Sequence, residues 1–220
     1  MKRLIIVGAG GFGREVLGWL PRCAGYGQDW SFAGFLTDGP ETLTDHGYTE
    51  PILGTIDGYA IQAHDVFLVA VGEPRDKLEV VERLRQRGAS FQTLIHDSSI
   101  VSRNVRIGEG VCLCPYVIVS CDVVLGAHTV LNLASTVGHD VVVGEGCTLS
   151  PHCDLTGYVR LGRGVFLGAH AAVHPRVTVG DFARIGAGSV ALFDVPARTT
   201  IVGVPGKRLL TEAESDDETS

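Results

Sequence analysis

The chain has 220 residues, 45% hydrophobic and only 7% aromatic, with a formal charge of −7. Five acidic residues lie in the last ten positions; without them the charge is −2, so the body of the chain lacks the basic surface that binds nucleic acid. No apolar run reaches the roughly eighteen residues of a membrane span, and no signal peptide is evident at the start. The six cysteines are scattered without metal-ligand spacing. We therefore expect a cytoplasmic protein with reduced thiols and no nucleic-acid, membrane or metal partner.

The first part of the chain alternates strand and helix patterns. The sequence predicts strands at residues 4–7, 32–36, 66–71 and 90–94, and helices at 14–20 and 75–86. Strands that alternate with helices favour a parallel sheet, in which ligands bind at the carboxyl ends of the strands. Residues 1–94 are therefore predicted to form an α/β, Rossmann-like domain with its ligand at that edge of the sheet.

A glycine-rich segment, residues 8–13 (GAGGFG), separates the first strand from the first helix. Backbone N–H groups in this position can hold a phosphate, although the same glycines also suit a plain tight turn. A dinucleotide is one reading, with Asp38 on the ribose. Only three or four strands fit before residue 95, about half of a dinucleotide fold, so one nucleotide, alone or joined to a sugar, suits the size better.

The second part of the chain is a repeat of six residues. From Ile95 to Ile185 every sixth residue is Ile, Leu or Val, sixteen times in succession. This period indicates a solenoid of stacked coils, with three repeats per triangular coil and residues eighteen apart stacked at about 4.8 Å. The glycines that follow many of these aliphatics are expected to supply special backbone torsions at the corners. Residues 95–206 are predicted to form an all-β parallel helix of just over five coils, and 207–220 an acidic, disordered tail.

Polar residues that interrupt the repeat mark the candidate chemistry. His139 follows the glycine of its repeat and is expected on a corner, with Gly157 one coil later leaving space beside the imidazole. Histidine is the natural general base near neutral pH, and Asp140 could hold the ring in one tautomer. The alternative is a solvated corner histidine without a role.

Four motifs carry a resemblance to a known family: IVGAGG at residues 6–11, LIH at 94–96, VGHD at 137–140 and VGVPGK at 202–207. With these motifs the chain resembles the hexapeptide-repeat sugar O- and N-acetyltransferases, which include sialic acid O-acetyltransferase and bacterial nucleotide-aminosugar N-acetyltransferases. The resemblance implies a left-handed β-helix, although parallel crossovers are generally right-handed. It also implies a homotrimer with acetyl-CoA between neighbouring subunits, His139 as the base and Asp140 as the group that orients it.

The resemblance further implies two sets of binding residues. Those expected to bind acetyl-CoA are Thr148, Gly157, Ala169, Ala187 and Lys207. Those expected to bind the nucleotide sugar are Gly10, Gly11, Phe12, Asp38 and Gly72. Two positions depart from relatives that have a histidine there, namely Thr148 and Phe12.

These features favour one reaction and leave alternatives open. The favoured reaction moves an acetyl group from acetyl-CoA to the amine of a nucleotide-linked amino sugar, without a covalent enzyme intermediate because no serine or cysteine shows an activating partner. The alternatives are O-acetylation of a sugar hydroxyl such as that of sialic acid, an NAD-dependent oxidoreductase, and a non-catalytic trimeric scaffold.

Overall fold

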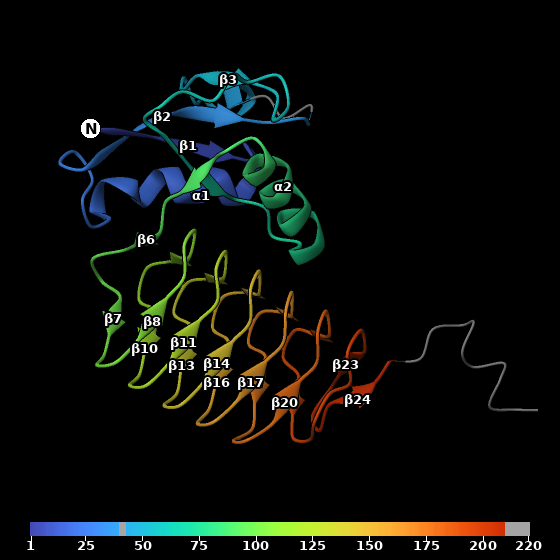
Figure 1. The fold of residues 1–220 in the computed structure, drawn as a ribbon. Helices are drawn as coiled ribbons and strands as arrows, with labels where there is room; N and C mark the ends of the chain where they lie inside the picture. The colour runs from blue at the N-terminus through green and yellow to red at the C-terminus, as the bar shows by residue number, and fades with distance from the viewer. Residues whose placement is uncertain (40–42, 210–220) are drawn as a thin grey trace, which may run out of the picture.

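The computed structural model describes residues 1–39 and 43–209, and it shows an α/β part stacked on a regular β-helix (Figure 1). The α/β part has a five-stranded parallel sheet of order β3-β2-β1-β4-β5. Its strands are β1 (Lys2–Val7), β2 (Trp30–Leu36), β3 (Ile52–Gly54), β4 (Asp65–Val69) and β5 (Ser90–Phe91). Its helices are α1 (Gly11–Trp19) and α2 (Pro74–Gln86), with short 3-10 turns η1 (Leu20–Arg22) and η2 (Leu43–His46). The predicted strands and helices are present, and the edge strand β3 was not predicted.

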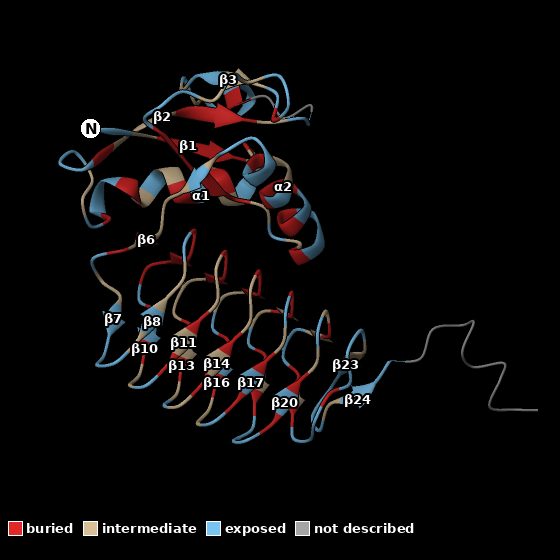
Figure 2. Ribbon diagram, in the orientation of Figure 1, coloured by how far each residue is buried: buried red, intermediate tan, exposed pale blue. Residues whose placement is uncertain are grey.

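Successive residues of β1 pack into different cores on the two sides of the sheet. Leu4 and Ile6 join the cluster that includes Val16 of α1, whereas Ile5 and Val7 join the cluster that includes residues of α2. Because strand side chains alternate between faces, each helix covers one face, and both faces are buried as Figure 2 shows. The uninterrupted apolar sequence of β1 is thereby explained.

The β-helix has three flat faces, each a sheet of parallel strands, apart from one antiparallel strand that ends the first face. The first face has eight strands: β6 (Leu94–Ile95), β9 (Cys112–Leu113), β12 (Val130–Leu131), β15 (Thr148–Leu149), β18 (Phe166–Leu167), β21 (Arg184–Ile185), β23 (Thr200–Val202) and the antiparallel β24 (Lys207–Arg208). The second face has six: β7 (Ile100–Val101), β10 (Ile118–Val119), β13 (Thr136–Val137), β16 (Asp154–Leu155), β19 (Ala172–Val173) and β22 (Val190–Ala191). The third face has five: β8 (Arg106–Ile107), β11 (Val124–Leu125), β14 (Val142–Val143), β17 (Arg160–Leu161) and β20 (Thr178–Val179).

The pairing register confirms the predicted repeat. Val119 pairs with Val137 and Val137 with Leu155, each eighteen residues apart. The aliphatic of each repeat ends a two-residue strand, and from Leu113 onward these side chains are at most 3% exposed. Each such burial stabilises the fold by roughly 1.5–3 kcal/mol. Strand β24 lies beyond residue 206, and the remainder of the predicted acidic tail, from residue 210, lies outside the described residues.

The predicted role of the repeat glycines is wrong, because positive φ occurs at a different position of the repeat. From Val101 onward it falls three residues after each aliphatic, and most residues there are not glycine, for example His128 (φ 58°) and Asp140 (φ 59°). Glycines directly after the aliphatics are needed for a different reason. A Cβ on Gly108 or Gly126 would lie 2.6 Å from a backbone nitrogen of the next coil.

The α/β part docks on the first face of the β-helix through α2. A Cβ on Gly146 would lie 2.6 Å from the side chain of Leu78, and Arg184 of β21 forms a 2.8 Å ion pair with Glu73 at the start of α2. Within residues 1–39 and 43–209, no helix covers the other two faces (Figure 1). Within residues 1–39 and 43–209 no helix has the length and apolarity to cross a membrane.

Candidate active site

His139 and Asp140 form a dyad on the outside of the β-helix, in the turn from β13 on the second face to β14 on the third. Nδ1 of His139 lies 2.8 Å from Oδ2 of Asp140, and the two side chains are 53% and 42% exposed. The positive φ of Asp140 (59°) turns the chain so that the carboxylate can reach the neighbouring ring. The amide of Asp140 donates to the carbonyl of Cys121, and the amide of Tyr158 donates to the carbonyl of His139. The coils on both sides therefore hold the backbone of the dyad.

The imidazole of His139 lies over Gly157, one coil further along the β-helix. A Cβ on Gly157 would be 2.7 Å from Nε2 of His139. The sequence led us to expect open space beside the ring, whereas the ring itself fills that space. Glycine is required here because any side chain would displace the imidazole.

A second carboxylate lies near the dyad, one coil earlier. Asp122 accepts a hydrogen bond of 2.9 Å from Asn104. That bond is the main cause that holds the pKa of Asp122 below its usual value, with smaller contributions from Cys121 and from the charge of His139. Asp122 thus adds a second carboxylate to the surroundings of His139.

This arrangement suits general-base catalysis. When Nδ1 carries the proton and donates it to Asp140, the lone pair of Nε2 is free to accept a proton from an acceptor group. The resulting imidazolium is then stabilised by the adjacent carboxylate.

A separate hollow of about 360 Å³ lies at the carboxyl ends of β1 and β4. All five residues predicted to bind the nucleotide sugar line it, namely Gly10, Gly11, Phe12, Asp38 and Gly72. Backbone N–H groups at the start of α1 would face an anion bound in this hollow. The hollow has the location expected for a ligand in a parallel α/β sheet.

The carboxylate of Asp38 is already engaged in the structure. It accepts a 2.8 Å hydrogen bond from the amide of Ile56 and a 3.1 Å bond from Arg83, which also pairs with Asp57. Ile56 lines the same hollow and was not predicted. It comes from the loop after β3, and no local motif marks that loop as part of the site.

The residues predicted to bind acetyl-CoA are distributed over several parts of the β-helix. Gly157 lies against His139. Ala169 and Ala187 follow β18 and β21, in turns between the first and second faces, where Ala187 is exposed. Lys207 is exposed on β24, and its neighbours Gly206 and Arg208 line a hollow of about 420 Å³ at the end of the β-helix.

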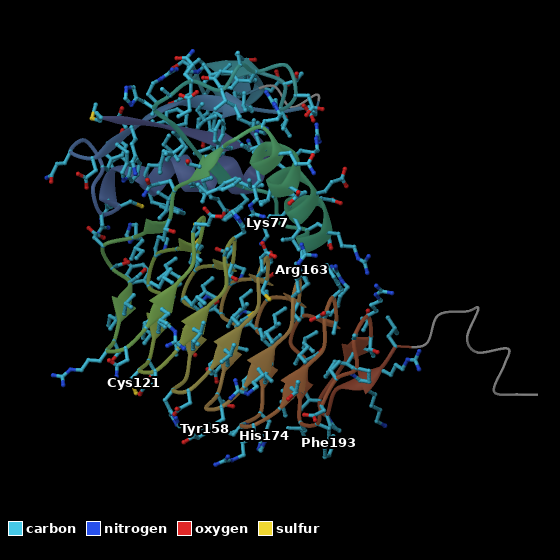
Figure 3. The ribbon with its side chains drawn as sticks, in the orientation of Figure 1. Lys77, Cys121, Tyr158, Arg163, His174 and Phe193 are labelled. Carbon is cyan, nitrogen blue, oxygen red and sulfur yellow. The ribbon has the colours of Figure 1, made fainter. Side chains whose placement is uncertain are left out.

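Thr148 does not fit its predicted contact with the cofactor. It is 5% exposed on the first face, and its hydroxyl accepts a 2.7 Å hydrogen bond from Lys77 of α2. Lys77 is itself buried and also donates to the carbonyl of Cys147 at 3.0 Å (Figure 3). This position is on the face opposite the turn that carries His139. The sequence missed the contact because nothing in either segment marks a partner 71 residues away.

Within one protomer, the dyad and the nucleotide-sized hollow lie on opposite sides of the β-helix. The turn with His139 joins the second and third faces, whereas the α/β part covers the first face. Tyr158, which contacts His139, accordingly lies at the edge of the molecule farthest from α2 in Figure 3.

Comparison with known proteins identifies relatives of this fold and site. Residues 3–84 match the model of the PglD N-terminal domain. The structure of PerB from Caulobacter crescentus with CoA and GDP-perosamine is 30% identical, with a TM-score of 0.83 over 96% of this chain and 98% of that chain. The acetyltransferase domain of PglB from Neisseria gonorrhoeae FA1090 with acetyl coenzyme A is 28% identical, with a TM-score of 0.82 over 94% and 99%. A UDP-N-acetylbacillosamine N-acetyltransferase of Bacillus subtilis (strain 168) is 33% identical over 112 residues, half of this chain and half of that relative.

The α/β domain with its glycine-rich hollow, joined to a three-sided β-helix, is an arrangement that this chain shares with these sugar acetyltransferases over nearly its whole length. The chain belongs to the hexapeptide-repeat sugar acetyltransferase family, and its fold is the left-handed parallel β-helix of that family. The resemblance seen in the sequence motifs is therefore confirmed.

Proposed function

We propose that this protein transfers an acetyl group from acetyl-CoA to the amine of an amino sugar carried by a nucleotide, with His139 as general base. The observation that carries the proposal is the match over nearly the whole chain to PerB in complex with both CoA and GDP-perosamine. A histidine-to-asparagine variant of that perosamine N-acetyltransferase also matches, with a TM-score of 0.86. All six cysteines are free, which agrees with a cytoplasmic location.

The proposed reaction needs no covalent intermediate. Nε2 of His139 takes a proton from the sugar amine as the nitrogen attacks the thioester carbonyl. The C–S bond then breaks, and the imidazolium returns its proton to the departing sulfur, so CoA leaves as the thiol and His139 is neutral again. Asp140 stabilises the imidazolium, and a backbone N–H of the β-helix stabilises the oxyanion. Burial raises the pKa of three of the cysteine thiols to about 11 or 12 (Cys23, Cys147 and Cys153), which makes them poor nucleophiles.

We propose that the active site is completed by a homotrimer. The dyad and the nucleotide-sized hollow of one protomer face away from each other. In the proposed trimer, the dyad of one subunit therefore lies close to the hollow of its neighbour. Ile100 and Ile118 point outward from the second face and are 60% and 45% exposed, and closure around a three-fold axis would bury such side chains. His139 on one edge of this face and Ala169 and Ala187 on the other would then meet across the subunit boundary.

The experiment is a thiol-release assay with acetyl-CoA and a panel of UDP-, GDP- and dTDP-linked amino sugars, each paired with its non-aminated sugar nucleotide. Transfer to an amino sugar, with mass spectrometry showing one added acetyl group on nitrogen, is the expected result. If the non-aminated sugar nucleotides are acetylated instead, the enzyme is an O-acetyltransferase and the proposed N-transfer is wrong. Absence of transfer with every acceptor, together with no CoA-dependent thermal shift, would contradict the proposal.

The oligomeric state is tested by sedimentation equilibrium on the full chain. A single species of three times the 23.3 kDa monomer mass is expected. An active monomer would show that one protomer holds a complete site.

A further inference from the structure

The dyad has a neighbour in the next coil that the family motifs do not include. Tyr158 lies one coil beyond Asp140, at the same positive-φ position of the turn (φ 64°). Its ring is perpendicular to the imidazole of His139, with an interplanar angle of 89° and centroids 5.1 Å apart. Aromatic rings prefer this edge-to-face arrangement.

Tyr158 is in turn held by the coil after it. The guanidinium carbon of Arg176 lies 4.5 Å from the centroid of the Tyr158 ring, a cation–π contact. Arg176 also occupies the positive-φ position of its turn (φ 68°). Among the described residues no carboxylate pairs with Arg176, so its stacking on Tyr158 is its main side-chain contact.

The dyad needs such a support because both of its members are more than 40% exposed. Exposed ion pairs hold their side chains weakly, since water and salt compete for them. Asp140 contacts the imidazole at one ring nitrogen only, and this leaves the ring free to tilt about that bond. Gly157, beside the ring, has no side chain that could hold it.

We propose that Tyr158, backed by Arg176, is a positioning residue that holds the His139 imidazole with Nε2 directed at the acceptor amine. This role rests on the proposed function, in which His139 is the base. A displacement of a catalytic group by about 1 Å can cost up to about a hundredfold in rate. Loss of a single supporting ring contact is expected to cost about tenfold.

The chain offers a matched control in Tyr116. This tyrosine occupies the same positive-φ position (φ 64°) in a turn between the first and second faces, and it is 64% exposed. Tyr116→Ala therefore reproduces the backbone effect of Tyr158→Ala without removing a contact with the dyad of its own chain. Tyr158→Phe keeps the ring and removes only the hydroxyl.

The first measurement is steady-state kinetics on the trimeric enzyme. Tyr158→Ala is expected to lower kcat about tenfold, with both KM values within twofold of wild type. Tyr158→Phe and Tyr116→Ala should stay within twofold, and Arg176→Ala should fall about threefold. A Tyr158→Phe enzyme as slow as Tyr158→Ala would assign the effect to the hydroxyl, and an unchanged kcat in Tyr158→Ala would remove Tyr158 from the mechanism.

The second measurement does not depend on activity. In spectra of protein with labelled histidine, the Cε1 proton of His139, assigned with His139→Asn, should show a ring-current shift in wild type and Tyr158→Phe that disappears in Tyr158→Ala. Persistence of the shift in Tyr158→Ala would overturn the contact itself. If the wild-type enzyme transfers no acetyl group, the proposed function fails while this spectrum still decides the contact.

Discussion

Two histidines lie in different turns of the β-helix, and one is buried whereas the other is exposed. His128 lies in the turn from the third face to the first and is 2% exposed. Its ring packs perpendicular to Phe91 at 4.6 Å, and Nε2 lies 3.1 Å from Arg85 of α2. His139 lies in the next turn but one, on the side that α2 does not reach, and is 53% exposed.

Whether the α/β part covers the turn determines the charge and the accessibility of each histidine ring. Burial, reinforced by the charge of Arg85, lowers the pKa of His128 to about 4, so this ring is neutral and structural at neutral pH. His139 has a carboxylate partner instead and a ring nitrogen open to an acceptor. The repeat alone therefore does not make a catalytic turn. The turn proposed to be catalytic differs from the His128 turn in two ways: the α/β part leaves it uncovered, and Asp140 contacts its ring.

The largest predicted effect separates the two histidines. His139→Ala should lower kcat by about 10²–10⁴, the range for loss of a general base, with little change in melting temperature. His128→Ala should lower the free energy of unfolding by about 1–3 kcal/mol, because a buried ring and its contact with Arg85 are lost. Its kcat should remain within threefold of wild type. Equal losses of kcat in the two variants would contradict the distinction.

The next effect concerns Lys77, the buried amine under α2. Burial lowers the pKa of Lys77 from 10.5 to about 8, so the unfolded chain binds more protons than the folded chain between these pH values. Wild-type stability should therefore rise by about 3 kcal/mol from pH 8 to pH 10.5, relative to Lys77→Met. Denaturant unfolding of both proteins at each pH measures the difference in their free energies of unfolding. Because both proteins contain the same thiols, including Cys147, the titration of these thiols largely cancels in that difference. A parallel pH dependence in the two proteins would show that the amine is not desolvated.

His128 should give a smaller effect on the acid side. Its folded pKa of about 4 lies below the unfolded value of 6.5, so stability is complete above pH 6.5 and is lost as the pH falls toward 4. The expected loss is on the order of 2 kcal/mol relative to His128→Ala. His152→Ala is the matched control, because His152 holds the same positive-φ position (φ 60°) in an exposed turn. The control variant should retain the wild-type loss of stability in acid.

The smallest effect tests the space around the dyad. Gly157→Ala should lower kcat about tenfold, because the added Cβ would meet Nε2 of His139 at 2.7 Å and tilt the ring. Gly188→Ala is the control: nothing lies within 4 Å of a Cβ there, and its positive φ (65°) costs about 1 kcal/mol of stability. If Gly157→Ala retains full activity, the imidazole has room that the structure does not show.

The sequence predicts features that depend on neighbouring residues or on the fixed repeat. The apolar residues of β1, the glycine-rich segment after it and the apolar face of α2 each form a local pattern, and all three elements occur where predicted. The eighteen-residue register likewise follows from the spacing of the aliphatics alone. His139 was found because it interrupts a uniform background of small residues.

The remaining features depend on contacts that no local pattern encodes. All three faces of the β-helix repeat the same pattern, so the sequence does not say that α2 covers the first face. The assignment of Thr148 to the cofactor failed for this reason, since Lys77 occupies its hydroxyl. The misassigned glycines have a related cause. A glycine can serve a torsion or a close backbone approach, and only the neighbouring coil distinguishes the two.

Because residues eighteen apart pair, the length of the β-helix is set by its number of coils. Removing or adding eighteen residues would change its length by one step of about 4.8 Å while every outward side chain keeps its direction. The separation between the His139 turn and the hollow beside Arg208 can therefore change only in such steps. Homologues of different coil number would therefore hold the two places at discrete separations, and an insertion within a coil that is not a multiple of eighteen residues would turn one place relative to the other.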